Sequence, residues 1–188
     1  MKAMIRFHNH VVAALLAVFL AALPAGAVDR AKLDSLFSRL KDAKDAGEAG
    51  RIESEIQIEW TKSGSPAMDL LYQRATDALA VGNAQAAVEH FTAIIDHDPA
   101  FVAAWDGRAA AYYLSGEIGP AVGDLAHVLT AEPRHFAALA GLATILEETG
   151  DKEKALAAYR AAADIHPYMQ DVNDAIDRLS KDLEGQDL

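Results

Sequence analysis

Three histidines, His97, His135 and His166, are the side chains best placed to share a metal ion. Each lies within two residues of a proline, where we expect the chain to turn, so they could line one edge of the fold. Successive turns between packed helices lie roughly 10 Å or more apart, whereas zinc lies about 2 Å from a histidine nitrogen. The spacing therefore predicts that these histidines hold no shared metal ion.

Short motifs of common active sites are missing from the sequence. It contains no glycine-rich phosphate loop, no nucleophile elbow and no His-Glu-x-x-His zinc pattern. Cysteine is absent, which excludes disulfide bonds and a thiolate zinc site. The acidic side chains are spread as they would be on solvated helix faces. We therefore predict no catalytic residue, no metal site, no cofactor and no enzymatic activity.

The chain is organised by a 34-residue repeat that covers residues 68–101, 102–135 and 136–169. One proline and one glycine recur at the same place in every block, namely Pro99, Pro133 and Pro167, and Gly82, Gly116 and Gly150. With background frequencies of about 5% for proline and about 7% for glycine, this agreement arises by chance roughly once in 10⁵. The blocks therefore form an internal repeat.

Each block predicts two helices on either side of its glycine. In the second block, Trp105, Ala109 and Tyr112 recur at helical spacing before the glycine, and Ala121 and Leu125 do so after it. Glycine supplies the left-handed backbone that ends the first helix, and proline ends the second. Small side chains let neighbouring helices approach closely, while large ones fill the adjoining space. The pattern thus predicts antiparallel helix pairs that pack on one another.

These blocks resemble the tetratricopeptide repeat (TPR) family. The likeness rests on the period and on a large fourth residue, a small eighth, a bulky eleventh, alanine at the twentieth, an aromatic residue or leucine at the twenty-fourth and proline at the thirty-second. Arg74 and Arg108 depart from it at the seventh place, where leucine is commoner; we expect their stems to pack while the guanidinium reaches water. The resemblance implies an all-α, right-handed superhelical solenoid of antiparallel helix pairs, with three TPR units, a degenerate leading hairpin and a C-terminal capping helix.

In this family the first helices line a concave groove that binds a peptide segment or helix of a partner. Subtracting the packing stripe leaves these predicted peptide-binding residues: Asp69, Tyr72, Thr76, Asp106, Tyr113, Thr144 and Glu147. Family members that grip a terminal carboxylate place Lys, Arg and Asn on this surface. Since none of these residues is basic or an amide, we expect a neutral or basic peptide with apolar anchors and no carboxylate-clamp chaperone tail. Alternatively, the tyrosines only cover neighbouring helices.

Residues 1–27 have the pattern of a secretory signal peptide. Lys2 and Arg6 precede an apolar run from residue 11 to 23, and Ala-Gly-Ala follows. That run is too short for a comfortable transmembrane helix. We expect cleavage after Ala27 and a periplasmic protein, with retention of the segment as a membrane anchor as the alternative.

The mature chain has two further flanks. Residues 28–67 predict a degenerate helical hairpin that serves as a leading repeat or cap. Residues 170–188 predict a capping helix and tail, because Val172, Ile176, Leu179 and Leu183 form one apolar stripe.

The signal removes two of the 17 basic residues, so 15 basic and 28 acidic side chains remain. This charge opposes nucleic acid and anionic membrane surfaces.

Three hypotheses for the function follow. The first is a non-catalytic adaptor of the cell envelope that binds a protein partner in its groove. The second is a general holdase for unfolded exported chains. The third is an accessory subunit of an envelope enzyme complex, in which the three histidines would matter for activity or metal uptake.

Overall fold

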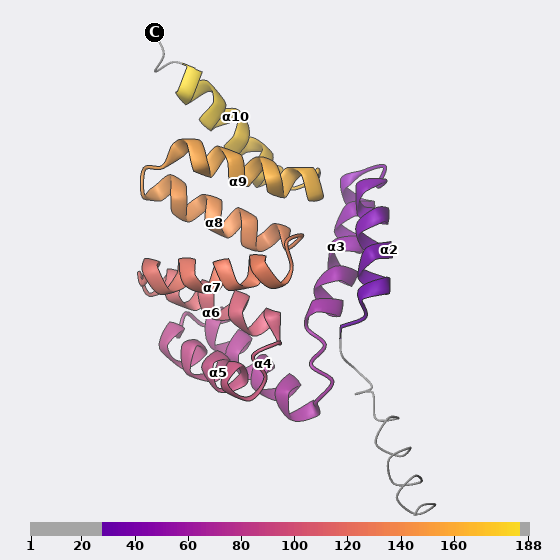
Figure 1. Ribbon diagram of the computed structural model, residues 1–188, viewed down its shortest axis with the longest axis vertical. Coiled ribbons are helices and arrows are strands. Elements are labelled where there is room, and N and C mark those ends of the chain that lie inside the picture. Colours follow the sequence, from indigo (N-terminus) through magenta and orange to yellow (C-terminus); the bar gives the residue numbers. More distant parts are fainter. Residues whose placement is uncertain (1–27, 185–188) are drawn as a thin grey trace, which may run out of the picture.

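The computed structural model describes residues 28–184, in which all regular elements are helices (Figure 1). They are α2 (Arg30–Lys41), α3 (Ala46–Trp60), α4 (Pro66–Ala80), α5 (Ala84–His97), α6 (Val102–Leu114), α7 (Ile118–Ala131), α8 (Phe136–Glu148), α9 (Lys152–Ile165) and α10 (Gln170–Glu184). The predicted signal peptide and the last four residues of the predicted tail lie outside the described residues. Across residues 28–184, no helix combines the length and apolar character needed to cross a membrane.

The three blocks form three stacked helix pairs, α4 with α5, α6 with α7 and α8 with α9 (Figure 1). The glycine of each block has a positive φ, 76° at Gly82, 78° at Gly116 and 91° at Gly150, which is the left-handed conformation expected of it. Asn83 and Asp151 then accept hydrogen bonds from backbone N–H groups in the first turns of α5 and α9. The all-α solenoid predicted from the repeat is confirmed.

The core of the solenoid follows the predicted alternation of small and large side chains. Ala87, Ala121 and Ala155 are fully buried at the same place in the three second helices. Four residues later in each helix, Phe91 and Leu125, with Tyr159 in the third, are also buried. Because each large side chain reaches the next pair, the hydrophobic clusters continue from one block to the following one.

Arg108 differs from the expectation that its guanidinium would reach water. Its Nε lies 2.7 Å from one carboxylate oxygen of Asp124 and its Nη2 lies 2.9 Å from the other. Its Nη1 donates to Thr92 at 3.1 Å, and the guanidinium lies 4.8 Å from the centre of the Trp105 ring. The expectation was wrong here because α7 supplies a buried carboxylate to pair with the guanidinium. Arg74, by contrast, is exposed.

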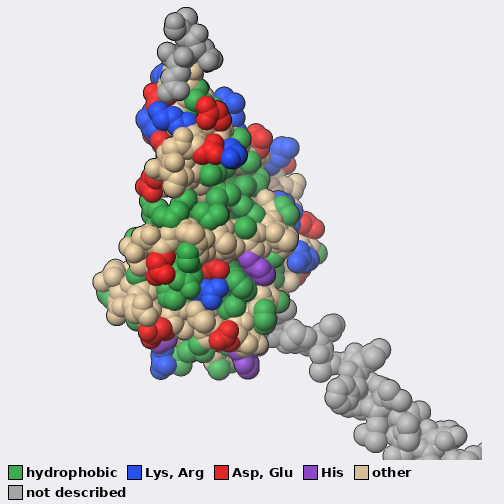
Figure 2. Space-filling model, turned by 60° about the vertical axis from the view of Figure 1, so that its left-hand side comes forward, with side chains coloured by type: hydrophobic (Ala, Val, Ile, Leu, Met, Phe, Trp, Pro, Cys, Tyr) green, Lys and Arg blue, Asp and Glu red, His purple; other side chains and the backbone are tan. Residues whose placement is uncertain are grey.

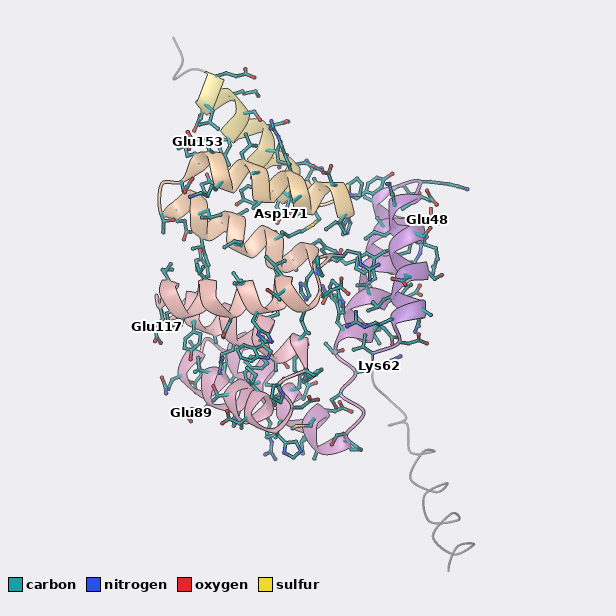
Figure 3. All side chains as sticks on the ribbon, viewed as in Figure 1. Glu48, Lys62, Glu89, Glu117, Glu153 and Asp171 are labelled. Atoms are coloured by element: carbon teal, nitrogen blue, oxygen red, sulfur yellow. The ribbon has the colours of Figure 1, made fainter. Side chains whose placement is uncertain are left out.

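The N-terminal hairpin of α2 and α3 is present, but it does not stack ahead of the first block as a leading repeat would. It lies beside the solenoid and runs across the ends of the repeat helices (Figure 1). Its apolar side chains share one buried cluster with Phe136 and contact Ile165, Tyr168 and Met169, which belong to the third block. Side chains fill the space between the hairpin and α8 and α9 (Figure 3). The prediction of its place was therefore wrong.

Specific contacts attach the hairpin to the turns that end the second and third blocks. The Trp60 ring stacks on His135 with centroids 3.9 Å apart. The Tyr168 hydroxyl donates to the Ala43 carbonyl at 2.8 Å, and Arg134 lies 2.7 Å from Asp34. These contacts join residues between 75 and 125 positions apart, which is why the hairpin's own pattern could not place it.

Within the hairpin, Glu59 is fully buried and pairs with two lysines. Its carboxylate lies 2.6 Å from Lys62 and 3.1 Å from Lys32, and it accepts from the backbone N–H of Asp29. Burial opposes its ionisation, but these three hydrogen bonds outweigh burial and lower the pKa of Glu59 to about 2. The ion pair between Lys32 and Glu59 ties α2 to the end of α3.

At the other end, α10 covers the last repeat, as the sequence predicted. Val172, Ala175 and Leu179 are buried against α9. The Arg178 guanidinium pairs with Glu147 of α8. Lys, Arg, Asp and Glu gather at this end of the face shown in Figure 2, whereas hydrophobic side chains form a band across its middle.

Candidate functional site

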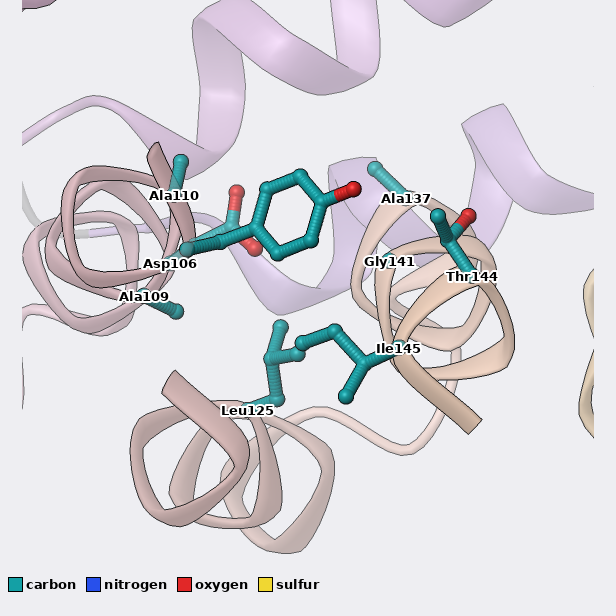
Figure 4. A pocket seen from close by; sticks show the side chains of 9 residues that line it. Asp106, Ala109, Ala110, Leu125, Ala137, Gly141, Thr144 and Ile145 are labelled. Carbon is teal, nitrogen blue, oxygen red and sulfur yellow. The ribbon is translucent and has the colours of Figure 1, made fainter. Parts of the chain in front are cut away.

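A pocket of about 240 Å³ lies between α6 and α8, the first helices of the second and third blocks (Figure 4). Its polar side chains are Asp106, Tyr113 and Thr144. The remaining lining is apolar and consists of Ala109, Ala110, Leu125, Ala137, Gly141 and Ile145. Ala110 and Asp106 lie across the pocket from Ala137 and Thr144, and the side chains of Leu125 and Ile145 meet on a third side (Figure 4).

The pocket exists because α7, the second helix of the second block, carries a smaller side chain here than α5 does at the matching position of the first block. Leu125 occupies the repeat position of Phe91, and Gly141 occupies that of Gly107. A Cβ added to Gly107 would lie 2.2 Å from Cζ of Phe91, so that ring already fills the space beside the glycine. A Cβ added to Gly141 would lie 3.9 Å from the nearest carbon of Leu125, an ordinary contact. Leucine thus leaves space that phenylalanine fills.

Asp106 is the acidic group of this pocket. Within residues 28–184 its half-buried carboxylate has no hydrogen-bond or ion-pair partner, whereas Asp124 and Glu147 are each paired with an arginine. Burial raises the pKa of Asp106, and the neighbouring His135 opposes that rise. Burial also lowers the pKa of His135, which favours a neutral imidazole. Asp106 is therefore a half-buried acid that has no cation beside it and whose carboxylate still reaches solvent.

The two hydroxyl groups of the pocket are already engaged. The Tyr113 hydroxyl donates to Glu148 at 2.6 Å, and this hydrogen bond raises the pKa of Tyr113. The Thr144 hydroxyl donates to the Ala140 carbonyl at 3.1 Å. It also lies 3.0 Å from the Tyr159 hydroxyl. A ligand entering the pocket therefore finds a single free charged group and apolar walls.

Three predicted groove residues, Asp106, Tyr113 and Thr144, meet in this pocket, but the other four lie elsewhere. Tyr72 packs against the rings of Phe91 and Phe101, with centroids 5.7 and 5.5 Å apart. Burial, together with the charge of Asp106, raises the pKa of Tyr72 to about 12. This is the alternative role considered for the tyrosines, in which they cover neighbouring helices.

The remaining predicted groove residues have local partners. Asp69 is exposed and accepts a hydrogen bond from Ser63. The Thr76 hydroxyl donates to the Gln73 carbonyl in its own helix. Glu147 pairs with Arg178, which lowers the pKa of Glu147. Their role in binding a peptide stays a prediction.

Sequence reasoning missed part of the apolar lining of the pocket. Ala109 and Leu125 were placed on the packing stripe, and Gly141 was given no role. The signal that could have found them is the alignment of the blocks, which sets Leu125 against Phe91. The difference in volume between these side chains indicates space at the second junction.

The three histidines have separate surroundings. His135 stacks on Trp60, and His166 Nε2 lies 3.2 Å from Glu53, so both lie where the hairpin meets the solenoid. His97 is exposed at the end of α5. Among the residues that the structure describes, no group of three or more His, Asp or Glu is arranged to hold a metal ion.

Comparisons with known proteins agree with this architecture. No family model matches the chain. A TPR repeat-containing protein of Rhizobium etli is 34% identical over 161 residues, which is 86% of this chain and 79% of the relative.

Solved TPR structures have a similar fold. The TPR domain of Sgt2 from Aspergillus fumigatus has a TM-score of 0.60 at 21% identity, over 65% of this chain and 83% of that one. The first TPR of Spaghetti (RPAP3), bound to an HSP90 peptide, has a TM-score of 0.59 at 17% identity, over 62% of this chain and 93% of that one. The Yersinia enterocolitica secretion chaperone SycD, in complex with a peptide of YopD, has a TM-score of 0.56 at 18% identity, over 64% of this chain and 92% of that one. From the repeat, the helix pairs and the extent of the Rhizobium match, we conclude that the chain belongs to the tetratricopeptide repeat family.

Proposed function

We propose that this protein is a non-catalytic interaction module that holds a segment of a partner protein in the pocket between α6 and α8. The observation that carries the proposal is the pocket itself, in which Asp106, Tyr113 and Thr144 stand among apolar walls. Concave, mostly apolar sites with few polar groups are the usual form of a binding site. Two similar TPR structures contain a bound peptide, which supports a peptide as the class of ligand.

The chemistry of the pocket favours a neutral or basic segment. Its only charged side chain is acidic, and the chain after residue 27 carries 28 acidic against 15 basic side chains. A terminal carboxylate would meet Asp106 and no cation at this pocket. The proposed partner segment is therefore internal or basic, which differs from the ligand of a carboxylate clamp.

The proposed place of action is the periplasm. It rests on the signal pattern of residues 1–27, where Lys2 and Arg6 precede the apolar run. Sequencing the N-terminus of the protein purified from its native compartment tests this proposal. A mature chain that begins at Val28 supports export with cleavage, and a chain that retains residues 1–27 contradicts cleavage.

Affinity capture with a variant that fills the pocket tests the proposed site. Leu125→Phe places the larger ring of the first junction at the second, and should reduce enrichment of the partner at least about 10-fold if the pocket is a binding hot spot. The matched control is Ala126→Phe, because Ala126 is the next residue and is exposed. Thermal unfolding of both variants checks that they fold.

The pattern of captured proteins separates the three hypotheses. One partner that the wild type and Ala126→Phe enrich and Leu125→Phe loses supports the adaptor. Equal recovery by Leu125→Phe removes the pocket from the proposal. Many unrelated chains captured at similar ratios indicate a holdase. Loss of an envelope enzyme activity after substitution of His97, His135 and His166 indicates an accessory subunit.

A further inference from the structure

We propose that the pocket between α6 and α8 takes a lysine side chain of the partner segment, with its apolar stem against Leu125 and Ile145 and its ammonium at Asp106. This inference rests on the proposed function and names the residue type that would anchor the segment.

The free carboxylate is the first reason. Within residues 28–184 Asp106 is half-buried in the pocket lining without a hydrogen bond or an ion pair, and burial lowers the pKa of the neighbouring His135, which favours its neutral form. Partial burial of an unpaired carboxylate is unfavourable, and an ammonium group placed beside it offsets that cost.

The walls of the pocket are the second reason. Ala109, Leu125, Gly141 and Ile145 offer carbon surface between the opening and the acid. Lysine carries its charge on a four-carbon stem, which can lie along such a surface while the ammonium reaches a polar group. An uncharged aliphatic side chain would contact the same walls but would leave Asp106 without a partner.

The number of free acceptors favours lysine over arginine. The hydroxyls of Tyr113 and Thr144 are held by their own hydrogen bonds to Glu148 and Ala140, so the carboxylate of Asp106 is the strongest acceptor on the lining side chains. A guanidinium has five N–H donors in a fixed plane, so the donors that do not meet Asp106 would mostly face apolar walls. An ammonium has three donors, of which two can meet the carboxylate and one can meet water.

Titration of the full-length mature protein with small probes, followed by ¹H–¹⁵N NMR, tests the inference. The probes are the N-acetyl, N-methylamide derivatives of lysine, norleucine and arginine. We expect the lysine probe to shift the amide signals of Ala109 and Gly141 and to bind about 10-fold tighter than norleucine, since a charge-assisted hydrogen bond is gained. Arginine should bind more weakly than lysine.

The variant Asp106→Asn keeps the shape of the pocket and removes its charge. It should bind the lysine and norleucine probes equally, and Asp164→Asn, an exposed residue of α9, should behave as the wild type. Three results would overturn the inference: equal binding of lysine and norleucine by the wild type, a lysine preference that survives Asp106→Asn, or no shift at the pocket. Norleucine binding without a lysine preference leaves the proposed function standing with an apolar anchor. Partner capture unaffected by Leu125→Phe contradicts the proposed function itself.

Discussion

Two junctions join the three repeats, and the same repeat positions face each other at both. Three of these positions carry different side chains at the two junctions. The first junction has Tyr72, Phe91 and Phe101, and the second has, in the same order, Asp106, Leu125 and His135. The first set forms a cluster of aromatic rings. The second set leaves a pocket of about 240 Å³ with one acid in it. The helices and turns of the two junctions are otherwise alike.

The comparison shows how a solenoid can gain a site without a change of backbone. Each repeat contacts only its neighbours, so a junction can lose packing while the other junctions keep the stack together. The second junction is also the one that the hairpin braces, because Trp60 stacks on His135 and packs near Phe136. Phe101 fills space at the first junction. His135 has the same repeat position at the second junction, where it faces the hairpin and Asp106.

Truncating the large side chain at each junction should give the largest difference. Phe91→Ala should lower the free energy of unfolding by about 3 to 5 kcal/mol, because Phe91 is fully buried and its removal opens a cavity. Leu125→Ala should cost only about 2 kcal/mol, at the low end of such changes, because Leu125 already borders open space. Chemical denaturation measures both values. Equal losses would contradict the view that the first junction is filled and the second is open.

Adding one methyl group at the paired glycines should act in opposite directions. Gly107→Ala should destabilise the protein by about 1 to 3 kcal/mol, since its Cβ would lie 2.2 Å from the buried Phe91 ring. Gly141→Ala should stabilise it by up to about 1 kcal/mol, because the space is free and alanine favours the helix. Thermal unfolding of the two variants gives the signs. A stabilised Gly107→Ala protein would mean that Phe91 moves freely.

Replacing Asp106, the acid of the second junction, should have the smallest effect on stability, and this effect should depend on pH. The pKa of Asp106 is raised in the folded state, so the folded protein is penalised as pH rises from the ordinary aspartate range through the raised value. Asp106→Asn should therefore match the wild type in stability at low pH and exceed it at neutral pH. Unfolding curves from pH 3 to 8 test this, with the exposed Asp164→Asn as control. A constant difference across this range would show that folding does not raise the pKa of Asp106.

The sequence predicted the repeat architecture well because its signals are local. Gly82, Gly116 and Gly150 fix the turns through their own backbone conformation, and Asn83 caps the helix that follows it. The position of the hairpin was predicted wrongly, since contacts such as that of Tyr168 with Ala43 join distant segments and leave no periodic pattern.

The candidate site was predicted in part for a related reason. Helical register places Asp106, Tyr113 and Thr144 on the inner face, so their direction could be inferred. The pocket itself depends on Leu125 and Gly141, whose separation is a property of two helices packed together. Register also placed Tyr72 on that face, but Tyr72 packs against the neighbouring rings of Phe91 and Phe101, which partly bury it.

Photo-crosslinking at one repeat position tests the difference between the junctions most directly. Ala110 lines the pocket, and Thr76 occupies the same position in the first block. A small diazirine amino acid would be placed at either residue, and the protein irradiated in its native compartment. We predict a crosslinked partner from position 110 and none from position 76. Equal crosslinking from both positions, or crosslinking from position 76 alone, would contradict a binding site at the second junction.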